Sequence, residues 1–346
     1  MEEQDVIRMG MIGCGGNMRG HIRRVLTIPE AQIVGLVEPS ADNVRILHDT
    51  YPTLAEVPVF ADHGEMLRAV RPDAVEISTP HTMHHRQILD SLAAGAHVLC
   101  EKPMTCTSEE AKEVCDRAAA TGKVVMVSYQ RHQQALYRWM RTFIGAGELG
   151  DLQVVTAQQY QSWYEGRVAG KGWRHLAHLS GGGQLNDSGS HMVDILLHVT
   201  QLQPRTVCAF QQNLELEVDV NMVINVQFQG GTMGSITIVG QAPGIGGYVY
   251  EDVTITGDRA GLYYRTMGTP EPRTPVLQLR RRGNTEPEPE LPGLPEGSDP
   301  DHAFVDVILG RAENEAPPLC GLRTIQLSEA AWRSAAAGGA PVDVSD

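Results

Sequence analysis

The chain has 346 residues, of which 42% are hydrophobic and 20% are charged, and this composition is typical of a globular protein with room for two domains. The net charge is −14 and no basic tract occurs, which argues against nucleic acid or an anionic membrane as the partner. No apolar run reaches membrane-spanning length, the charged start is unlike a signal peptide and the six cysteines form no CxxC pair, so we expect a cytoplasmic protein with reduced thiols and no metal site.

Residues 5–127 alternate short apolar runs with amphipathic segments of helical period. Thr107 and Glu110 have the spacing of a capping box, which predicts that a helix begins there. Strands that alternate with helices in this way are typical of an α/β domain with a parallel, doubly wound sheet. The apolar runs expected to form its strands are residues 6–12, 32–37, 57–60, 74–78, 97–100 and 124–127.

The pattern changes after residue 130. A helix is expected at 134–144, and residues 218–228 alternate apolar with mostly polar side chains, which indicates a sheet with one buried face, usually antiparallel. We therefore predict two domains, residues 1–129 and 130–346, with the C-terminal helices packing back toward the first domain. Further elements expected in this half are strands at 231–240 and 248–257, a long loop at 266–300 around one strand near 275–281, and helices at 302–311 and 324–338.

The sequence GCGGNM, residues 13–18, follows the first predicted strand. Gly13 and Gly15 have the spacing of a tight turn that lets backbone N–H groups approach a pyrophosphate at the start of a helix. Glu38 ends the second strand, where a carboxylate binds both ribose hydroxyls and repels a 2′-phosphate, which favours NAD over NADP. Met18 stands where a third glycine or an alanine is usual. The alternative interpretation is an ordinary glycine turn beside a surface acid.

Two polar segments follow later strands. HVLCEKPM, residues 97–104, places Lys102 just after a strand end, and STPHTMHH, residues 78–85, follows the preceding strand. Ligands of doubly wound sheets bind outside the carboxyl ends of the strands, so Lys102 is a candidate site residue. A solvated loop lysine is the alternative. The three histidines of the second segment are alternatively parts of a polar loop and a helix cap, since no zinc spacing recurs to pair with them.

The segment SGGGQLNDSGSHMVDIL, residues 180–196, joins a glycine run, which we expect to be flexible, to a predicted helix. The spacing of Asp187, His191 and Asp194 predicts that all three lie on one helix face. A carboxylate beside an imidazole is the pattern of an acid–base site. A capped helix with a satisfied core histidine is the alternative.

Aromatic residues lie between a predicted strand and this glycine run. They are Trp163, Tyr164 and Trp173, and Arg174 follows the last of them. An aromatic face can stack on a sugar ring, and a guanidinium can bind hydroxyls or a carboxylate. The alternative is a packed loop.

Over nearly its whole length the chain resembles the glucose–fructose oxidoreductase, inositol dehydrogenase and rhizopine catabolism (Gfo/Idh/MocA) family. The resemblance rests on GCGGNM, Glu38, STPHTMHH, the EKP of residues 101–103 and GGGQLNDSGSHMVD. It implies an N-terminal Rossmann domain and a C-terminal α+β domain with an open, mostly antiparallel sheet. It also implies NAD-dependent oxidation or reduction of sugars, polyols or related carbonyl compounds.

The resemblance implies that Lys102, Asp187 and His191 are the catalytic residues. His191 suits the proton transfer, Asp187 can orient it, and Lys102 can donate to the developing alkoxide, so no metal is needed. SYQRH at 128–132 replaces the Asn-Arg pair common in the family. The cofactor-binding residues expected are Gly13, Gly15, Gly16, Asn17, Met18, Glu38, Ser78, Thr79, Pro80, His84, Glu101, Lys102 and Gln130. The substrate-binding residues expected are Lys102, Arg131, Trp173, Arg174, Asp187, His191 and Asp194.

Two other functions remain open on these motifs. One is a glycosidase that oxidises, eliminates, hydrates and reduces with bound NAD, as some relatives of the family do. The other is a non-catalytic NAD-binding sensor, against which the intact set of Lys102, Asp187 and His191 speaks. We also expect a homodimer or homotetramer through the C-terminal sheet, because apolar residues such as Val223, Val239 and Val249 fall on its second face.

Overall fold

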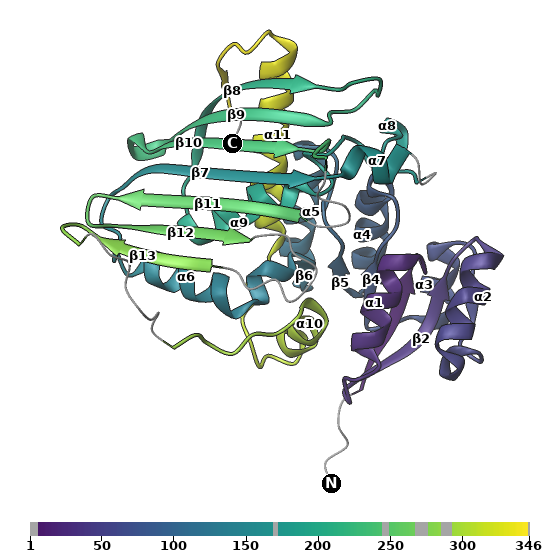
Figure 1. Cartoon of the computed structure of the whole chain (residues 1–346). Helices are drawn as coiled ribbons and strands as arrows, with labels where there is room; N and C mark the ends of the chain where they lie inside the picture. Colours follow the sequence, from purple (N-terminus) through teal and green to yellow (C-terminus); the bar gives the residue numbers. More distant parts are fainter. Residues whose placement is uncertain (1–5, 169–171, 244–248, 267–275, 285–292, 345–346) are drawn as a thin grey trace. The chain divides into compact units, whose positions relative to one another are not determined.

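The computed structural model describes residues 6–168, 172–243, 249–266, 276–284 and 293–344 (Figure 1). The chain divides into two units. The first unit comprises residues 1–133 and 298–322, and the second comprises residues 134–297 and 323–346. The chain therefore returns to the first unit with residues 298–322, which the sequence prediction grouped with 130–346.

The first unit contains a six-stranded sheet with the strand order β3-β2-β1-β4-β5-β6. All neighbouring strands in it are parallel, which confirms the predicted doubly wound sheet. Its strands are β1 (Ile7–Ile12), β2 (Ala31–Val37), β3 (Val59–Phe60), β4 (Ala74–Ile77), β5 (His97–Cys100) and β6 (Val125–Val127). Its helices include α1 (Gly16–Val25), α2 (Ala41–Thr50), α3 (His63–Val70), α4 (His84–Ala93), α5 (Ser108–Thr121) and α10 (Pro300–Ile308), with short 3-10 turns at His81–Met83 and Gln130–Gln133.

Strands β1, β4 and β5 of this sheet are buried on both faces, as their continuous apolar sequences require. Met9 and Met11 of β1 pack with Met18 and Ile22 of α1 and with Phe304 of α10 in one apolar cluster. The predicted capping box is confirmed at the start of α5, where the Thr107 hydroxyl accepts from the Glu110 N–H at 3.2 Å and the Glu110 carboxylate accepts from the Thr107 N–H at 3.2 Å.

The second unit contains an eight-stranded sheet with the order β13-β12-β11-β7-β10-β9-β8-β14. Among its described pairs only β7 and β10 are parallel, so the predicted mostly antiparallel sheet is confirmed. Its strands are β7 (Leu152–Gln161), β8 (Pro204–Gln212), β9 (Asn221–Phe228), β10 (Met233–Val239), β11 (Val249–Gly257), β12 (Ala260–Thr266), β13 (Val276–Arg281) and β14 (Val342–Asp343).

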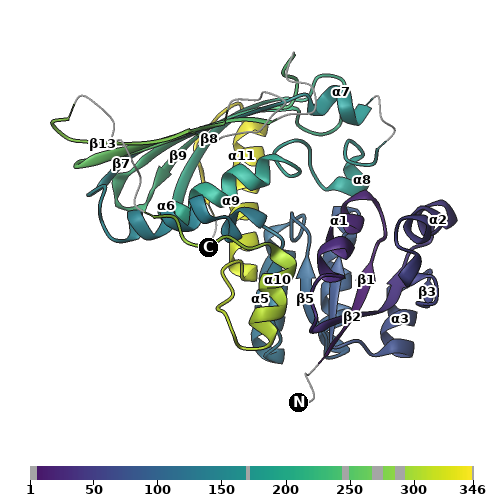
Figure 2. The same ribbon diagram turned by 60° about the horizontal axis from the view of Figure 1, so that its bottom comes forward.

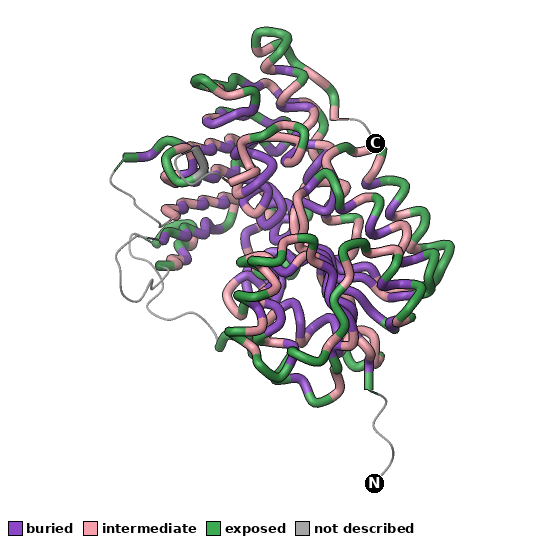
Figure 3. Tube along the Cα trace, turned by 90° about the vertical axis from the view of Figure 1, so that its right-hand side faces the viewer, coloured by how far each residue is buried: buried purple, intermediate pink, exposed green. Residues whose placement is uncertain are grey.

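Helices α6 (Ala135–Gly145) and α9 (Gly189–Thr200) lie against one face of this sheet (Figure 2). Burial alternates along its strands, as the colours of Figure 3 show and as the pattern of β9 illustrates. The side chains that point to the covered face form the core, and those that point away include Phe210, Val223 and Met233. The unit's other helices are α7 (Trp163–Val168), α8 (Ala177–Ser180) and the part of α11 (Pro318–Ala336) that follows residue 322.

The strand expected near residues 275–281 is present as β13. Most of the long loop predicted around it, residues 267–275 and 285–292, lies outside the described residues. The helices expected near the C-terminal end are present as α10 and α11. In the described parts of the chain, none of the helices combines the length and apolar character needed to cross a bilayer.

Candidate functional site

The glycine turn after β1 has the form that a phosphate-binding turn requires. Gly13 has a φ of +86°, and a Cβ built there would lie 2.6 Å from the carbonyl oxygen of Ser78. A Cβ on Gly15 would meet nothing within 4 Å, and one on Gly16 would meet only the tip of Arg19 at 3.7 Å. The backbone before α1 is therefore tightly bent at Gly13 and open at Gly15, where the positive end of the helix dipole begins.

Met18 occupies the third position of the glycine fingerprint and is fully buried. Its side chain fills the apolar cluster between α1 and the sheet. The sequence prediction placed Met18 among the cofactor-binding residues, and the structure gives its side chain a packing role.

Glu38 follows β2, and its carboxylate is bound at the glycine turn. One oxygen accepts the Cys14 N–H at 2.9 Å and the other accepts the Ser40 N–H at 2.9 Å. Burial and the charge of Glu38 raise the pKa of Cys14 to about 12, so this thiol stays neutral. Arg45, a cation near this position in sequence, lies within 3.5 Å of Asp42 and of Asp49, both acids of its own helix α2.

The segment after β4 joins the same edge of the sheet. Asn17 Nδ2 of α1 donates to the Ser78 hydroxyl at 3.3 Å. The fully buried ring of His84 lies between two backbone carbonyls, with Nε2 at 3.0 Å from Thr79 O and Nδ1 at 2.8 Å from Pro103 O. The ring therefore contacts the segments after both β4 and β5, and burial lowers its pKa.

Lys102 is the second residue after β5 and is half-buried. Its backbone N–H donates to Glu101 Oε2 at 3.1 Å, and the Lys102–Pro103 peptide is cis. Gln130 and Arg131 follow β6 in a short 3-10 turn. Because the strands of the first unit are parallel, the residues after β1, β2, β4, β5 and β6 lie along one edge of the sheet, as the sequence predicted.

In the second unit Asp187 is buried and held by two donors. Trp163 Nε1 donates to Oδ2 at 2.9 Å, and Arg174 Nε donates to Oδ1 at 3.2 Å. Helix α9 begins at Gly189, so the prediction that Asp187 lies on its face is wrong. Asp187 lies in the turn before the helix, where Ser190 Oγ donates to its carbonyl at 2.9 Å. Only Ser188 and Gly189 join Asp187 to the rest of α9, and the helical spacing counted back from His191 stops at Gly189.

His191 and Asp194 lie within α9, where His191 is half-buried and Asp194 is buried. The aromatic residues predicted to stack on a sugar contact other protein side chains in the structure. Trp163 is buried among Val218 and Val220, and its indole N–H is used by Asp187. The guanidinium of Arg174 lies 4.6 Å from the centre of the Trp173 ring, so these two support the anchor of Asp187.

The glycine run before Asp187 is close-packed, so the prediction of a flexible run is wrong. A Cβ on Gly183 would lie 1.9 Å from the carbonyl oxygen of Asp219, and one on Gly182 would lie 2.8 Å from Trp332 Cζ2. The Asp219 carboxylate accepts from the N–H groups of Gly183 at 3.1 Å, Leu185 at 2.7 Å and Trp332 Nε1 at 2.9 Å. Asp219 was not identified from the sequence as a functional residue. Its one signal in the sequence is its position between Val218 and Val220, just before β9.

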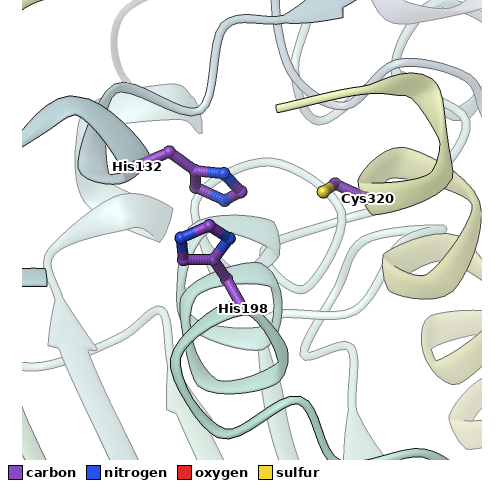
Figure 4. A group of neighbouring side chains, drawn as sticks. All are labelled: His132, His198 and Cys320. Atoms are coloured by element: carbon purple, nitrogen blue, oxygen red, sulfur yellow. The ribbon is translucent and has the colours of Figure 1, made fainter. Parts of the chain in front are cut away.

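Figure 4 draws three side chains of types that bind metals. His132 and Cys320 belong to the first unit, where their possible ligand atoms lie within 4.8 Å of each other. His132 Nδ1 also lies 2.8 Å from Glu315 O. His198 belongs to α9 of the second unit, where Arg141 Nη1 donates to its carbonyl at 2.6 Å. Within the described part of either unit taken alone, this group offers fewer than three ligands, so we do not assign a metal site to it.

Comparison with known families matches both parts of the chain. Residues 7–129 match the family described as "Oxidoreductase family, NAD-binding Rossmann fold", and residues 137–263 match the "GFO/IDH/MocA C-terminal domain". Both the predicted family and the predicted NAD-binding domain are confirmed by these matches.

Two curated relatives illustrate the similarity in sequence. D-glucoside 3-dehydrogenase of Escherichia coli K12 is 31% identical over 196 residues, which cover 56% of this chain and 54% of the relative. Inositol 2-dehydrogenase of Burkholderia lata is 31% identical over 146 residues, which cover 42% of this chain and 43% of the relative. The chain spans about half the length of the curated relatives it matches.

Solved structures share the fold over nearly the whole chain. The WlbA dehydrogenase from Bordetella pertussis, in complex with NADH and UDP-GlcNAcA, superposes with a TM-score of 0.82 at 22% identity and covers 99% of both chains. An inositol dehydrogenase homolog from Azotobacter vinelandii, complexed with NAD+, has a TM-score of 0.77 at 23% identity and covers 98% of this chain and 97% of its own. At these identities the likeness establishes the fold alone.

Proposed function

The chain belongs to the Gfo/Idh/MocA oxidoreductase family, and on this premise we propose that it transfers a hydride between NAD and a hydroxyl-bearing carbon of a sugar, polyol or related compound. The observation that carries the proposal is the shared sheet edge of the first unit, where Lys102 follows β5 and the Gly13 turn and Glu38 follow β1 and β2. The names of the curated relatives, a glucoside dehydrogenase and an inositol dehydrogenase, support the substrate class.

The residues of the glycine turn fit NAD. The open space at Gly15 leaves room for a pyrophosphate at the start of α1, and the fixed carboxylate of Glu38 suits a ribose with two free hydroxyls. Arg45 is paired with acids of its own helix, which leaves it poorly placed to serve a 2′-phosphate. NAD, when bound, supplies the redox centre that exchanges a hydride with the substrate carbon.

The chain's own residues supply the proton chemistry. In the oxidation direction His191 takes the hydroxyl proton, and Lys102 Nζ donates a hydrogen bond to the oxygen as its negative charge develops. Asp187 lies four residues before His191, and we propose that it orients the imidazole. Its carboxylate is fixed by hydrogen bonds from Trp163 and Arg174. In the reduction direction the same groups return the proton to the carbonyl oxygen.

The test is a screen of sugars, polyols and sugar acids for NADH formation, followed by kinetics on the substrate that it finds. Lys102→Ala and His191→Ala should each lower kcat by about 10²–10⁴-fold. The two losses should be less than additive in the double variant, because both groups act on one oxygen. Near wild-type kcat in either single variant would contradict the proposal.

Two matched controls are available in the first unit. Lys112→Ala removes an exposed lysine whose Nζ pairs with Asp116 on α5 at 2.7 Å, and His63→Ala removes a histidine that contacts Asp90 at 3.0 Å. Both variants should keep wild-type kcat. Net NADH production from a free sugar also separates a dehydrogenase from a glycosidase that regenerates its cofactor in every turnover.

We extend the proposal to assembly through the uncovered face of the eight-stranded sheet. Phe210, Val223 and Met233 are 63%, 46% and 58% exposed on that face, and Phe210 pairs directly with Val223 across β8 and β9. A second copy of the chain would cover them in a homodimer or homotetramer. Light scattering should report a multiple of the monomer mass at micromolar concentration, and a monomer would contradict this part of the proposal.

We also propose that the protein works in the cytoplasm. All six cysteines are free thiols, which supports a reducing compartment. Fluorescence of a tagged chain in intact cells should be confined to the cytoplasm, and recovery from a secreted fraction would contradict this.

A further inference from the structure

One face of α1 carries a polar stripe below the glycine turn. Asn17, His21 and Arg24 recur at helical spacing, so they point the same way along the helix. Asn17 contacts Ser78 after β4, whereas His21 and Arg24 reach acidic side chains of other segments of the first unit. The helix that begins at the proposed phosphate turn is therefore tied to its neighbours through polar side chains as well as through the apolar cluster.

His21 forms hydrogen bonds with two carboxylates although it is only 4% exposed. Its Nδ1 lies 2.8 Å from Asp301 Oδ1 of α10, and its Nε2 lies 3.0 Å from Glu101 Oε1. Burial lowers the pKa of His21, but the hydrogen bonds to Asp301 and Glu101 and the charge of Asp301 outweigh it and raise the pKa well above its usual range. The ring is therefore an imidazolium that donates at both nitrogens.

The second oxygen of Glu101 continues this chain of contacts to the lysine. Glu101 Oε1 faces His21, and Glu101 Oε2 accepts the backbone N–H of Lys102 at 3.1 Å. Burial raises the pKa of Glu101, but His21 more than reverses this and keeps the carboxyl ionised. An unbroken path of hydrogen bonds thus runs from Asp301 through His21 and Glu101 to the backbone of Lys102.

The charges of this network balance without a metal ion. The cations His21 and Arg24 face the anions Asp301 and Glu101. Burial and the charge of Asp301 raise the pKa of Glu76, a fully buried side chain 3.6 Å from His21, so its carboxyl stays protonated. His21, Glu76 and Asp301 could geometrically hold a metal ion, but a further cation here would be repelled by the two already present.

We propose that His21 is a positioning residue for Lys102. Anchored by Asp301 of α10, the imidazolium fixes Glu101, and Glu101 fixes the backbone from which the Lys102 side chain extends. The same helix starts at the glycine turn, so one rigid element sets both the cofactor turn and the lysine. This inference rests on the proposed function of Lys102, and small displacements of such a group are costly to catalysis.

The test compares His21→Gln with His63→Gln. His63 also contacts a carboxylate, Asp90 Oδ2 at 3.0 Å, and belongs to the same unit, but among the described contacts none connects it to Glu101. His21→Gln should lower kcat about tenfold or more while the KM for NAD changes by less than about twofold. His63→Gln should change neither.

A second readout does not depend on turnover. The rate at which trinitrobenzenesulfonate labels Lys102, followed by mass spectrometry of its peptide, should change in His21→Gln and not in His63→Gln. A folded His21→Gln protein with wild-type kcat and wild-type labelling, even at a lower melting temperature, would overturn the proposal, because a merely structural histidine gives that result.

A further variant covers the case in which His21→Gln does not fold. Glu101→Gln keeps the shape of the side chain and removes its charge, and it should reproduce the loss of kcat and the changed labelling of Lys102. Wild-type values in both measurements would overturn the proposal. If Lys102→Ala itself keeps full turnover, the proposed function fails, whereas the labelling experiment still decides whether His21 positions the lysine.

Discussion

The glycine-rich segments of residues 13–16 and 181–183 look alike in sequence, but Gly15 and Gly16 have open surroundings whereas Gly182 and Gly183 are closely packed. In the first segment, Cβ atoms on Gly15 and Gly16 would meet open space or a flexible side-chain tip. In the second segment, Cβ atoms on Gly182 and Gly183 would collide with Trp332 and with the backbone of Asp219. The space beside Gly15 and Gly16 is open, where we propose that the cofactor binds, whereas the protein itself fills the space beside Gly182 and Gly183.

This difference shows that a glycine run in the sequence is not enough to predict either a flexible segment or a ligand-binding segment. What distinguishes the two cases is whether the space beside the backbone is empty or filled in the folded chain. Substitutions can therefore separate them, because a filled position should respond in stability and an empty one in binding.

The largest effect is expected from Gly183→Ala. The new methyl would stand 1.9 Å from a backbone oxygen that cannot move aside as a side chain could. Overpacking of this kind should lower the free energy of unfolding by about 3 kcal/mol. Chemical denaturation of the variant and the wild type measures it, and an unchanged midpoint would show that the second segment is not close-packed.

Asp219→Ala should have the next largest effect. It removes the acceptor of three donors, the buried N–H groups of Gly183 and Leu185 and the indole N–H of the half-buried Trp332. The expected loss of unfolding free energy is about 2 kcal/mol. Asp219→Asn is the control, since it keeps one acceptor oxygen and should lose less, and equal losses in the two variants would argue against the carboxylate as the anchor.

Gly15→Ala should leave stability nearly unchanged and weaken NAD binding. The methyl would point into the open space at the start of α1, where we propose that the pyrophosphate lies, and about a tenfold rise in Kd is expected, or about 1.4 kcal/mol. Titration followed by NADH fluorescence measures it. Gly20→Ala, further along α1 with 3.7 Å of clearance, should bind NADH normally, and equal affinities in all three proteins would remove the proposed role of Gly15.

The smallest effect is expected from Glu38→Ala, which tests the residue beside the open segment. Loss of the carboxylate should reduce the preference for NAD over NADP about fivefold, the worth of one hydrogen bond of about 1 kcal/mol. Direct titration with both cofactors gives the ratio. A preference that does not change would mean that Glu38 only braces the Cys14 and Ser40 N–H groups.

Much of the first unit could be predicted because its signals are local. The alternation of apolar runs with helical segments gives the sheet, and parallel strands bring Glu38, Ser78 and Lys102 to one edge without further information. Asp187 and His191 were proposed from their helical spacing, but the helix begins two residues after Asp187, so that spacing does not place both on one helix face.

The contacts that hold the candidate residues could not be predicted. Trp163 and Asp187 are 24 residues apart, Gly183 and Asp219 are 36 apart, and none of these pairs leaves a local pattern in sequence. These contacts depend on which residues become buried in the folded chain. Trp163, predicted to stack on a sugar, lies in a core, and Gly183, predicted to be flexible, lies against the backbone of Asp219.

The return of residues 298–322 to the first unit has a consequence for the order in which the protein forms on the ribosome. His21 emerges early, and its partner Asp301 follows 280 residues later. Until then the nascent first unit holds His21 with Glu101 but without Asp301, the second hydrogen-bond partner of the imidazole, although its parallel strands are already synthesised. The first unit is therefore expected to complete its folding only after strands β7 to β13 of the second unit have been made, as a step of high contact order.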